Sequence, residues 1–597
     1  MMGGFRRRIA MEISLMGFCY QHFRGVGRVL ARLFYSNGGI RMEEVLEDAG
    51  LKIYPDAYYS LIGFLTVLAA VSVAPVVYIT GLTPLASAPL LVILLGYLAP
   101  KVLAYDRASK LDVEVPFAGT YISVMATGGL SPYQSLRKLK GCTLLPHISK
   151  AAKEIEADVE LKGLDPVTAM ERSALHLPSR SYRDLMLGYA SATRSGADVI
   201  HFLLAQTETM FRDLAARVRA FGDRAGILME SYIAIIILST LSLSVIFMTS
   251  MAFSEFWSGF FTAENYLLYA YLIVPGLSIL FVYLSDAAQL QHPVNEWGPY
   301  KVYLATLPLT VLLAASMFLP FTPLSIPQLA PPFTKPLTGL VASTRVMLGL
   351  EKGYEAAIGL ALTLIAGTLP AAYAHSHYSK RGRGLEGDIT NFLRDLTETR
   401  KTGASPEKCI EILSQRSYGR FSRHLKLAAR QIKWGFPFKV IYDSFRVRVR
   451  SWLALINIYL LVDAIEVGGG TPETLETLTG FSEMLISIEK EKAAMLRPLM
   501  MMPYMGAGIL LASTTVFLGF MRFVLYSFGR QAIPYTQFLN LLLPPMVLQA
   551  YLTGLVTGKI SSGVLSNGFK HALILAAAAL IIMPISSRFS LPFQPWR

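Results

Sequence analysis

The chain has 597 residues and a formal net charge of +14 at pH 7, with 55 Lys and Arg against 41 Asp and Glu. Hydrophobic residues make up 53% of it and charged residues 16%, whereas soluble domains carry about a quarter charged residues. This composition excludes an ordinary soluble protein and predicts several membrane crossings. The positive charge need not mean nucleic acid, because cytoplasmic loops of membrane proteins are rich in Lys and Arg. The scattered Cys19, Cys142 and Cys409 predict free thiols.

Residues 1–57 form a basic, amphipathic N-terminal region. Its arginines include Arg6, Arg7, Arg8, Arg24, Arg28 and Arg32. The apolar runs between them are too short for a signal peptide or a membrane span. We therefore expect one or two helices at the cytoplasmic membrane surface.

Nine apolar stretches are each near the ~20 residues that a bilayer crossing needs. They are residues 58–80, 83–103, 229–252, 266–285, 302–320, 356–375, 498–524, 538–557 and 571–587. Two large polar regions follow the second and the sixth stretch, so both lie on one side of the membrane. Most Lys and Arg lie on that side, which predicts a cytoplasmic N-terminus, cytoplasmic polar regions and an external C-terminus. Residues 253–265 and 321–337 would be external, and 321–355 would form a re-entrant or short surface helix.

The two polar regions repeat one pattern. Both contain a Gly-x-Ser-Pro turn followed by an amphipathic helix, and both contain a glycine break further on. These turn residues are Gly129, Ser131, Pro132 and Gly196 in the first copy and Gly403, Ser405, Pro406 and Gly470 in the second. Glycine ends a helix at low steric cost, serine caps the next helix and proline suits its first turn. A repeat this long indicates a duplicated domain rather than a solenoid.

Each copy is predicted to be helical throughout. In the first copy, Gly and Pro breaks delimit helices at 113–126, 132–140, 148–161, 166–176, 181–193 and 198–228. Strand-like alternation occurs only at 446–450. We expect the last helix of each copy to continue unbroken into the membrane, over 205–250 and 480–525.

The predicted fold class is therefore all-α: a polytopic membrane protein with about nine transmembrane helices and two homologous cytoplasmic helical bundles. The expected domains are an N-terminal region (1–57), a transmembrane hairpin (58–103), a first cytoplasmic domain (104–228), four spans (229–375), a second cytoplasmic domain (376–497) and three spans (498–597).

The candidate motifs for catalysis, cofactor binding and metal binding each lack residues that the chemistry requires. The stretch 554–560 resembles a phosphate loop, but it is one residue short and Ile560 replaces the Ser or Thr that magnesium needs. Residues 468–470 lack a following Lys-Ser/Thr. His375 and His377 have no further Cys or His nearby to complete a metal site. We expect no enzyme activity, no cofactor and no metal.

The interiors of the nine stretches contain no ionisable residue, since Glu230, Asp286 and Lys301 lie at their edges. Transport of ions or charged solutes is therefore disfavoured. A carrier for a neutral substrate remains open. Prolines within the spans are interpreted as kinks rather than as broken transporter helices.

Basic residues cluster in both polar regions. They are Arg137, Lys138 and Lys140 in the first copy, and Arg416, Arg420, Arg423, Arg446, Arg448 and Arg450 in the second. Two interpretations stay open: contact with anionic lipid headgroups, or docking of an acidic cytoplasmic partner. Nucleic acid is disfavoured because no reader motif accompanies the charge.

The duplicated Gly-x-Ser-Pro domains, each with a later glycine break and an apolar span, resemble the type II secretion system F domain. Leu46–Leu51 is also similar to family members, and the resemblance covers roughly residues 40–590. Two such domains in this topology look most like archaeal platform proteins of archaella and type IV-like pili, related to tight-adherence C proteins. In one departure, Arg194 and Ser195 stand where bacterial members often carry acidic residues, while the second copy keeps Glu466.

The resemblance implies a membrane protein that assembles filaments and performs no chemistry of its own. Its expected partners are a hexameric cytoplasmic ATPase, pilin or archaellin subunits and the lipid bilayer. Duplication further suggests pseudo-two-fold symmetry, so that one chain could act as a dimer of single-domain relatives does; a homodimer of the chain also stays open. A transporter or exporter subunit and a purely structural scaffold are the alternatives.

Overall fold

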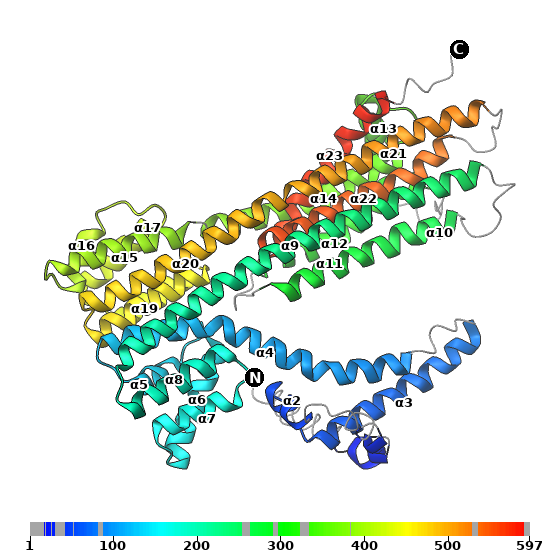
Figure 1. The fold of residues 1–597 in the computed structure, drawn as a ribbon. Helices are drawn as coiled ribbons and strands as arrows, with labels where there is room; N and C mark the ends of the chain where they lie inside the picture. Colours follow the sequence, from blue (N-terminus) through cyan, green and yellow to red (C-terminus); the bar gives the residue numbers. More distant parts are fainter. Residues whose placement is uncertain are drawn as a thin grey trace. The chain divides into compact units, whose positions relative to one another are not determined.

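The structure is a computed structural model that describes residue 17, residues 19–25, 27–29, 31, 42–51, 53–80, 88–252, 263–289, 297–322, 334–382, 384–527 and 535–589. Within these residues the chain is helical and contains no strand (Figure 1). The all-α fold class predicted from the sequence is therefore confirmed.

The chain divides into two compact units. Unit 1 comprises Met1–Phe211 with Leu460–Leu478, and unit 2 comprises Arg212–Tyr459 with Thr479–Arg597. Helices with residues in both units are α9 (Val199–Ala252), α19 (Trp452–Gly468) and α20 (Pro472–Leu499).

Unit 1 otherwise contains α2 (Met42–Asp48), α3 (Pro55–Thr80), α4 (Ala88–Thr127), α5 (Pro132–Leu139), α6 (Pro146–Lys162), α7 (Pro166–His176) and α8 (Arg180–Ser195). Helices α3 and α4 form a hairpin, in which the Tyr58 hydroxyl donates to the Gly96 carbonyl at 2.7 Å. Helix α4 continues through Pro100 and Pro116 into the first repeat. The separate elements predicted at 83–103 and 113–126 thus belong to one helix from residue 88 onward.

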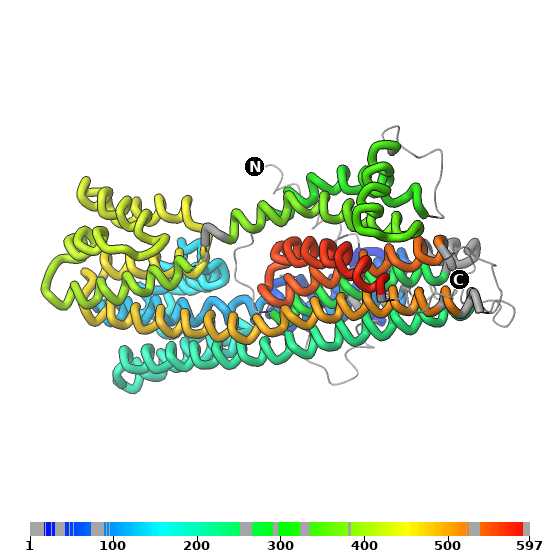
Figure 2. Tube along the Cα trace, turned by 90° about the horizontal axis from the view of Figure 1, so that it is seen from above, coloured from blue at the N-terminus to red at the C-terminus, as the bar shows by residue number. Residues whose placement is uncertain are grey.

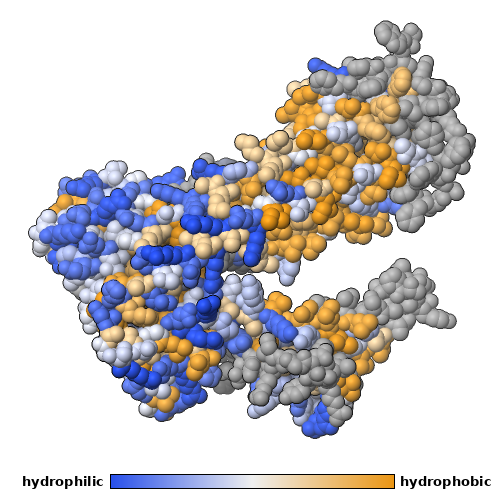
Figure 3. Space-filling view, viewed as in Figure 1, coloured by the Kyte–Doolittle hydropathy of each residue, from blue (hydrophilic) through white to orange (hydrophobic). Residues whose placement is uncertain are grey.

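Unit 2 otherwise contains α10 (Ala263–Leu268), the π-helical η2 (Tyr269–Ile273), α11 (Val274–Ala288), α12 (Gly298–Met317), the 3₁₀ turn η3 (Leu319–Phe321), α13 (Thr334–Met347), α14 (Glu355–Gly382), α15 (Leu385–Lys401), α16 (Pro406–Leu413), α17 (Phe421–Lys433), α18 (Phe438–Arg448), α21 (Met501–Ser527), α22 (Tyr535–Ser562), the 3₁₀ turn η5 (Leu565–Asn567) and α23 (Gly568–Phe589). In this unit, hydrophobic surface covers α9, α11 and α12, and hydrophilic surface covers α15 to α17 (Figure 3).

Within the described residues, eight helices are long and apolar enough to cross a membrane. They coincide with eight of the nine predicted stretches, and the protein is therefore a multi-pass membrane protein. The remaining stretch, 83–103, begins outside the described residues and continues in α4. Residues 253–262 and 323–333 also lie outside them, but α13 is a separate helix of 14 residues, too short to span a bilayer.

Helices α22 and α23 lie side by side in the unit 2 bundle (Figure 2). A Cβ atom at Gly554 would lie 2.4 Å from Ala572 Cα, and one at Gly558 would lie 2.1 Å from Gly568 Cα. These glycines therefore allow close helix packing. The residues that resembled a phosphate loop lie inside an α-helix, which confirms that no such loop forms there.

The two repeats enter the membrane differently. Helix α9 runs for 54 residues without a break, as predicted. In the second copy a single turn residue, Met500, separates α20 from α21 within a helical stretch of 49 residues, Pro472–Phe520, so the predicted continuation is found with one local interruption. Pro503 has no N–H to donate to the carbonyl of Leu499, which lies four residues earlier, and the helical hydrogen-bond pattern fails at this point.

The tight α22–α23 contact gives a stability prediction. Gly558→Ala should lower the midpoint of thermal unfolding of the purified protein by several degrees, because the added methyl group meets backbone atoms that cannot move aside. Gly276→Ala in α11 is the matched control, since nothing lies within 4 Å of its Cβ position. Equal midpoints for the two variants would contradict the close packing.

Candidate functional site

The two repeats contain the same helices in the same order. The end of α4 corresponds to α15, and α5, α6, α7, α8 and α9 correspond to α16, α17, α18, α19 and α20. Four of the six helices predicted for the first copy, at 132–140, 148–161, 166–176 and 181–193, agree within two residues with α5 to α8.

The Gly-x-Ser-Pro turns have matching geometry. Ser131 caps α5 and Ser405 caps α16, and each serine Oγ accepts a backbone N–H at 3.3 Å. The preceding Gly129 and Gly403 have φ of 90° and 85°, a region that favours glycine. The turn therefore closes one helix and opens the next in both copies.

A carboxylate in the first helix of each repeat caps the start of the third helix. The side chain of Glu114 is almost fully buried and accepts the backbone N–H groups of His147 and Ile148, both at 2.9 Å. Asp388 accepts the backbone N–H of Arg420 at 2.8 Å at the start of α17. Each carboxylate satisfies donors that a helix N-terminus leaves unpaired. Sequence reasoning did not assign this role to either carboxylate.

Two further contacts recur. The Ser179 hydroxyl donates to Asp112 in the first copy, and the Ser451 hydroxyl donates to Glu386 in the second. A hydroxyl pair also joins the first and last helices of each copy: Ser123 with Thr207 at 3.1 Å and Thr397 with Thr479 at 3.0 Å. The two copies are thus built on one set of internal contacts.

The later glycines end the fifth helix of each copy. Gly196 has a φ of 70° and terminates α8, where the N–H of Ala197 donates to Ala192 at 3.0 Å. In the second copy Gly470 has a φ of 56°, and its N–H donates to Ala464 at 3.1 Å. The neighbouring Arg194, the departure noted in the sequence, pairs with Glu171 at 2.6 Å.

The basic residues of the first repeat lie together at the end of α5. Arg137, Lys138 and Lys140 line one open surface depression of about 480 Å³. Arg137 and Lys140 pair with Glu156 at 2.9 and 2.8 Å, and Lys140 and Arg137 hold the pKa of the Glu156 carboxyl below its usual value. Much of the charge predicted for a partner is therefore balanced within the repeat.

The spacing of Arg416, Arg420 and Arg423 by four and three residues would place them on one face of a continuous helix, but the structure separates them. Arg416 lies in the loop after α16 and pairs with Asp395 at 3.0 Å. Arg420 is the N-cap of α17, and Arg423 is exposed within its first turn. The three arginines do not share a face, because the 414–420 loop intervenes.

The strand-like segment 446–450 is mostly helical. Arg446 and Arg448 belong to the last turn of α18, and Val449 is extended. Arg450 therefore lies beyond the helix, where its guanidinium lies 5.0 Å from the ring centroid of Tyr378. Arg446 and Arg450, four residues apart, would share a face if the helix continued, but it ends between them and they do not.

The helices that enter the membrane from the two repeats pack against each other in register. Arg219 on α9 pairs with Glu491 on α20 at 2.6 Å, 272 residues further on. Beyond this pair, the Cβ position of Gly222 meets Met495, and that of Gly506 meets Ile233. The contacts advance together along both chains, so the helices run parallel.

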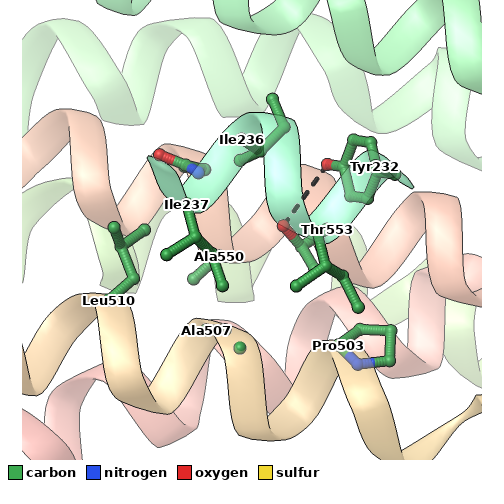
Figure 4. Close-up of a pocket in the computed structure, with 11 residues that line it drawn as sticks. Tyr232, Ile236, Ile237, Pro503, Ala507, Leu510, Ala550 and Thr553 are labelled. Atoms are coloured by element: carbon green, nitrogen blue, oxygen red, sulfur yellow. Dashed lines mark hydrogen bonds between the residues drawn. The ribbon is translucent and has the colours of Figure 1, made fainter. Parts of the chain in front are cut away.

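A small, mostly apolar cavity with a few polar side chains lies where α9, α21 and α22 meet (Figure 4). The Tyr232 hydroxyl is 3.3 Å from Thr553 Oγ1, and Pro503 and the buried Gln549 also line the cavity. Its volume is about 10 Å³, close to the smallest that holds one water molecule. It is far below the roughly 300–1,000 Å³ of ligand pockets.

Both repeats match the family model of the type II secretion system (T2SS) protein F, over residues 120–247 and 392–519. The chain is a type II secretion system F-domain protein. The two matches start 272 residues apart, so Arg219 and Glu491 occupy equivalent positions in the two F domains. Equivalent residues that face each other indicate a pseudo-two-fold axis between α9 and α20.

The chain is also similar to a second protein over about two thirds of its length. The F-domain protein is 23% identical over 437 residues to the uncharacterized protein MJ1286 of Methanocaldococcus jannaschii, with 68% of each chain covered. No solved structure matches the chain. Family and spans together support a membrane platform of a secretion or pilus type of system.

The capping carboxylates give a second prediction. Glu114→Ala and Asp388→Ala should each destabilise the protein, because they leave helix N–H donors unpaired; we expect about 1–3 kcal/mol for the buried Glu114 and about 0.5–2 kcal/mol for Asp388. Glu154→Ala, which removes an exposed carboxylate of α6, is the control. Limited proteolysis under native conditions measures the effect, and cleavage rates equal to the control would refute the capping role.

Proposed function

We propose that this F-domain protein is the membrane platform of an archaeal type IV pilus or archaellum assembly machine. In this role it docks a hexameric cytoplasmic secretion ATPase and transmits the motion of the ATPase to pilin or archaellin subunits that enter the filament. The observation that carries the proposal is the in-register pairing of α9 with α20. Each F domain leads into its own span, and the two leading helices are joined by Arg219–Glu491.

In this proposal the platform does not hydrolyse ATP, and its partner ATPase does. The phosphate-loop resemblance at 554–560 is part of α22, and Lys559 pairs there with Asp286 and with the Gly563 carbonyl instead of a nucleotide. ATP turnover would therefore belong to the ATPase, and the platform would contribute binding surfaces and connected helices.

The ATPase would dock on basic residues of the cytoplasmic F domains. Arg420, Arg423, Arg446 and Arg448 project from exposed positions on or beside α17 and α18. A concentrated positive field favours association with an acidic surface. Lys138 is exposed on α5 of the first copy.

A carrier for a neutral substrate is the second candidate. It would need an internal site that binds its solute, and the cavity at Tyr232 has room for about one water molecule. The platform is therefore the function that we favour.

Topology gives the third prediction. Single cysteines introduced in 113–225 and 386–495 should react only with maleimides that cross the membrane. A cysteine at Ser590 should also react with a membrane-impermeant maleimide added outside the cell. The test uses a background in which the three natural cysteines are replaced, and maleimide labelling of intact cells is the measurement. External labelling of either F domain would contradict the proposed orientation.

The fourth prediction concerns ATPase docking. Reversing Arg416, Arg420 and Arg423 to Glu should weaken ATPase binding in detergent and flatten its salt dependence, because each exposed pair is worth only roughly 0–1 kcal/mol and several must be lost together. Arg416 also pairs with Asp395, so the double variant Arg420→Glu/Arg423→Glu separates binding from folding.

The charge-matched control reverses Lys150 and Lys153 on α6, which are exposed in the first copy. Binding would be measured with the ATPase encoded in the same genome, in the absence of lipid. Unchanged affinity and unchanged salt dependence in the triple variant would place the contact elsewhere. Loss of membrane-surface docking alone would support the lipid interpretation.

A further inference from the structure

Two exposed aromatic residues lie at the turn between α17 and α18. The Trp434 side chain is 74% exposed and that of Phe436 is 45% exposed, although such residues are usually covered in folded proteins. Their ring centroids are 6.4 Å apart. Gly435, with a φ of 78°, and Pro437, the N-cap of α18, restrict the turn that presents them.

The apolar surface continues along the outer face of α18. Val440 and Val447 are 43% and 85% exposed and lie seven residues apart within α18. Such spacing puts both on one face of the helix, about 10 Å apart, and Phe436 lies just before the start of this helix. The opposite face is buried through Ile441, Tyr442 and Phe445. The outer face of α18 thus carries two exposed valines among the exposed charged residues Lys439, Asp443 and Arg446.

Positive charge surrounds the apolar stripe. Residues 421–448 contain seven Lys and Arg and a single acidic residue, Asp443. Lys433, Lys439 and Arg430 are exposed next to the aromatic turn. The corresponding hairpin of the first copy, 146–176, has four Lys and Arg against six Asp and Glu, and no aromatic residue at its turn. This surface therefore belongs to the second F domain alone.

The aromatic turn points away from the membrane. Arg450 lies against Tyr378 at the end of α14, so the end of α18 is level with the end of a span. Three residues connect α18 to α19, and Tyr442 contacts Tyr459 with ring centroids 5.5 Å apart, as expected for an antiparallel helix pair. Helix α18 has 11 residues, so its start lies about 16 Å along the helix axis from that level. Bilayer headgroups extend only about 5–8 Å beyond the hydrocarbon, so the turn lies outside them where α18 runs along the membrane normal.

We propose that the aromatic turn and the outer stripe of α18 form the anchor for a soluble protein partner with an acidic rim around an apolar groove. Trp434 and Phe436 would fill the groove, while the surrounding cations would meet the acidic rim. Exposed Trp and Arg side chains of this kind dominate the affinity of protein interfaces. The inference rests on the proposed function, since it makes the ATPase the partner to test first.

The test uses the full chain in phosphatidylcholine nanodiscs and the secretion ATPase encoded in the same genome. Trp434→Ala/Phe436→Ala should raise the Kd about tenfold or more and leave the salt dependence unchanged, because it removes apolar contacts and no charge. Val447→Asp at the other end of the stripe is an independent variant with the same expected direction. Ile412→Ala on α16, 43% exposed in the same F domain, is the matched control.

The outcomes separate the two proposals. Binding of the wild type with an unchanged Kd in both stripe variants overturns this inference and leaves the platform function standing. Absence of binding by the wild type at any salt concentration overturns both.

Lipid is the competing occupant. The difference in fluorescence between the wild type and Trp434→Phe isolates the emission of Trp434. Brominated acyl chains in the nanodisc should not quench this emission. Quenching would show that the stripe contacts the bilayer and would overturn the inference. Gel filtration and the thermal midpoint of every variant confirm that it is folded.

Discussion

A capping carboxylate in the first helix of each F domain fixes the start of the third helix, and the rest of the bundle depends on that contact. Glu114 does this from a buried position, and Asp388 does it at a loop. A helix N-terminus inside a small bundle needs acceptors for its free N–H groups, and water cannot easily supply them there. In the first copy the carboxylate sits on α4, the helix of the α3–α4 hairpin, so the bundle is held in a defined position relative to that helix.

The membrane imposes the second constraint, since backbone polar groups in lipid must be satisfied within helices. The F domains can therefore communicate with the bilayer only through whole helices, and α9 and α20 are the ones that pair. Their ion pair lies between equivalent positions, whereas the outer surfaces of the two copies have diverged in charge and in aromatic content. The two F domains are thus related by approximate symmetry at α9 and α20, while their outer surfaces differ. Such a difference would allow the two domains to bind different partners.

Local chemistry made much of this fold predictable. The Gly-x-Ser-Pro turns act through neighbouring residues, and span hydropathy is a property of composition, so Ser131, Ser405 and eight spans were found from sequence. Tertiary contacts were not predictable in the same way. The partner of Arg416 is Asp395, 21 residues away in the sequence, and no periodicity indicates it. The aromatic turn at Trp434 was also missed, because an isolated Trp in a sequence says nothing about its exposure.

The interruption at Met500 gives the two copies different mechanical properties. Helix α9 has an unbroken set of hydrogen bonds, so it resists bending and carries an axial push or a twist as a stiff rod. Around Met500, Pro498 and Pro503 have already removed bonds, and the angle between α20 and α21 can change at little further enthalpic cost. The leading helix of the second copy therefore has a point of lower bending stiffness near its membrane end, which α9 of the first copy lacks.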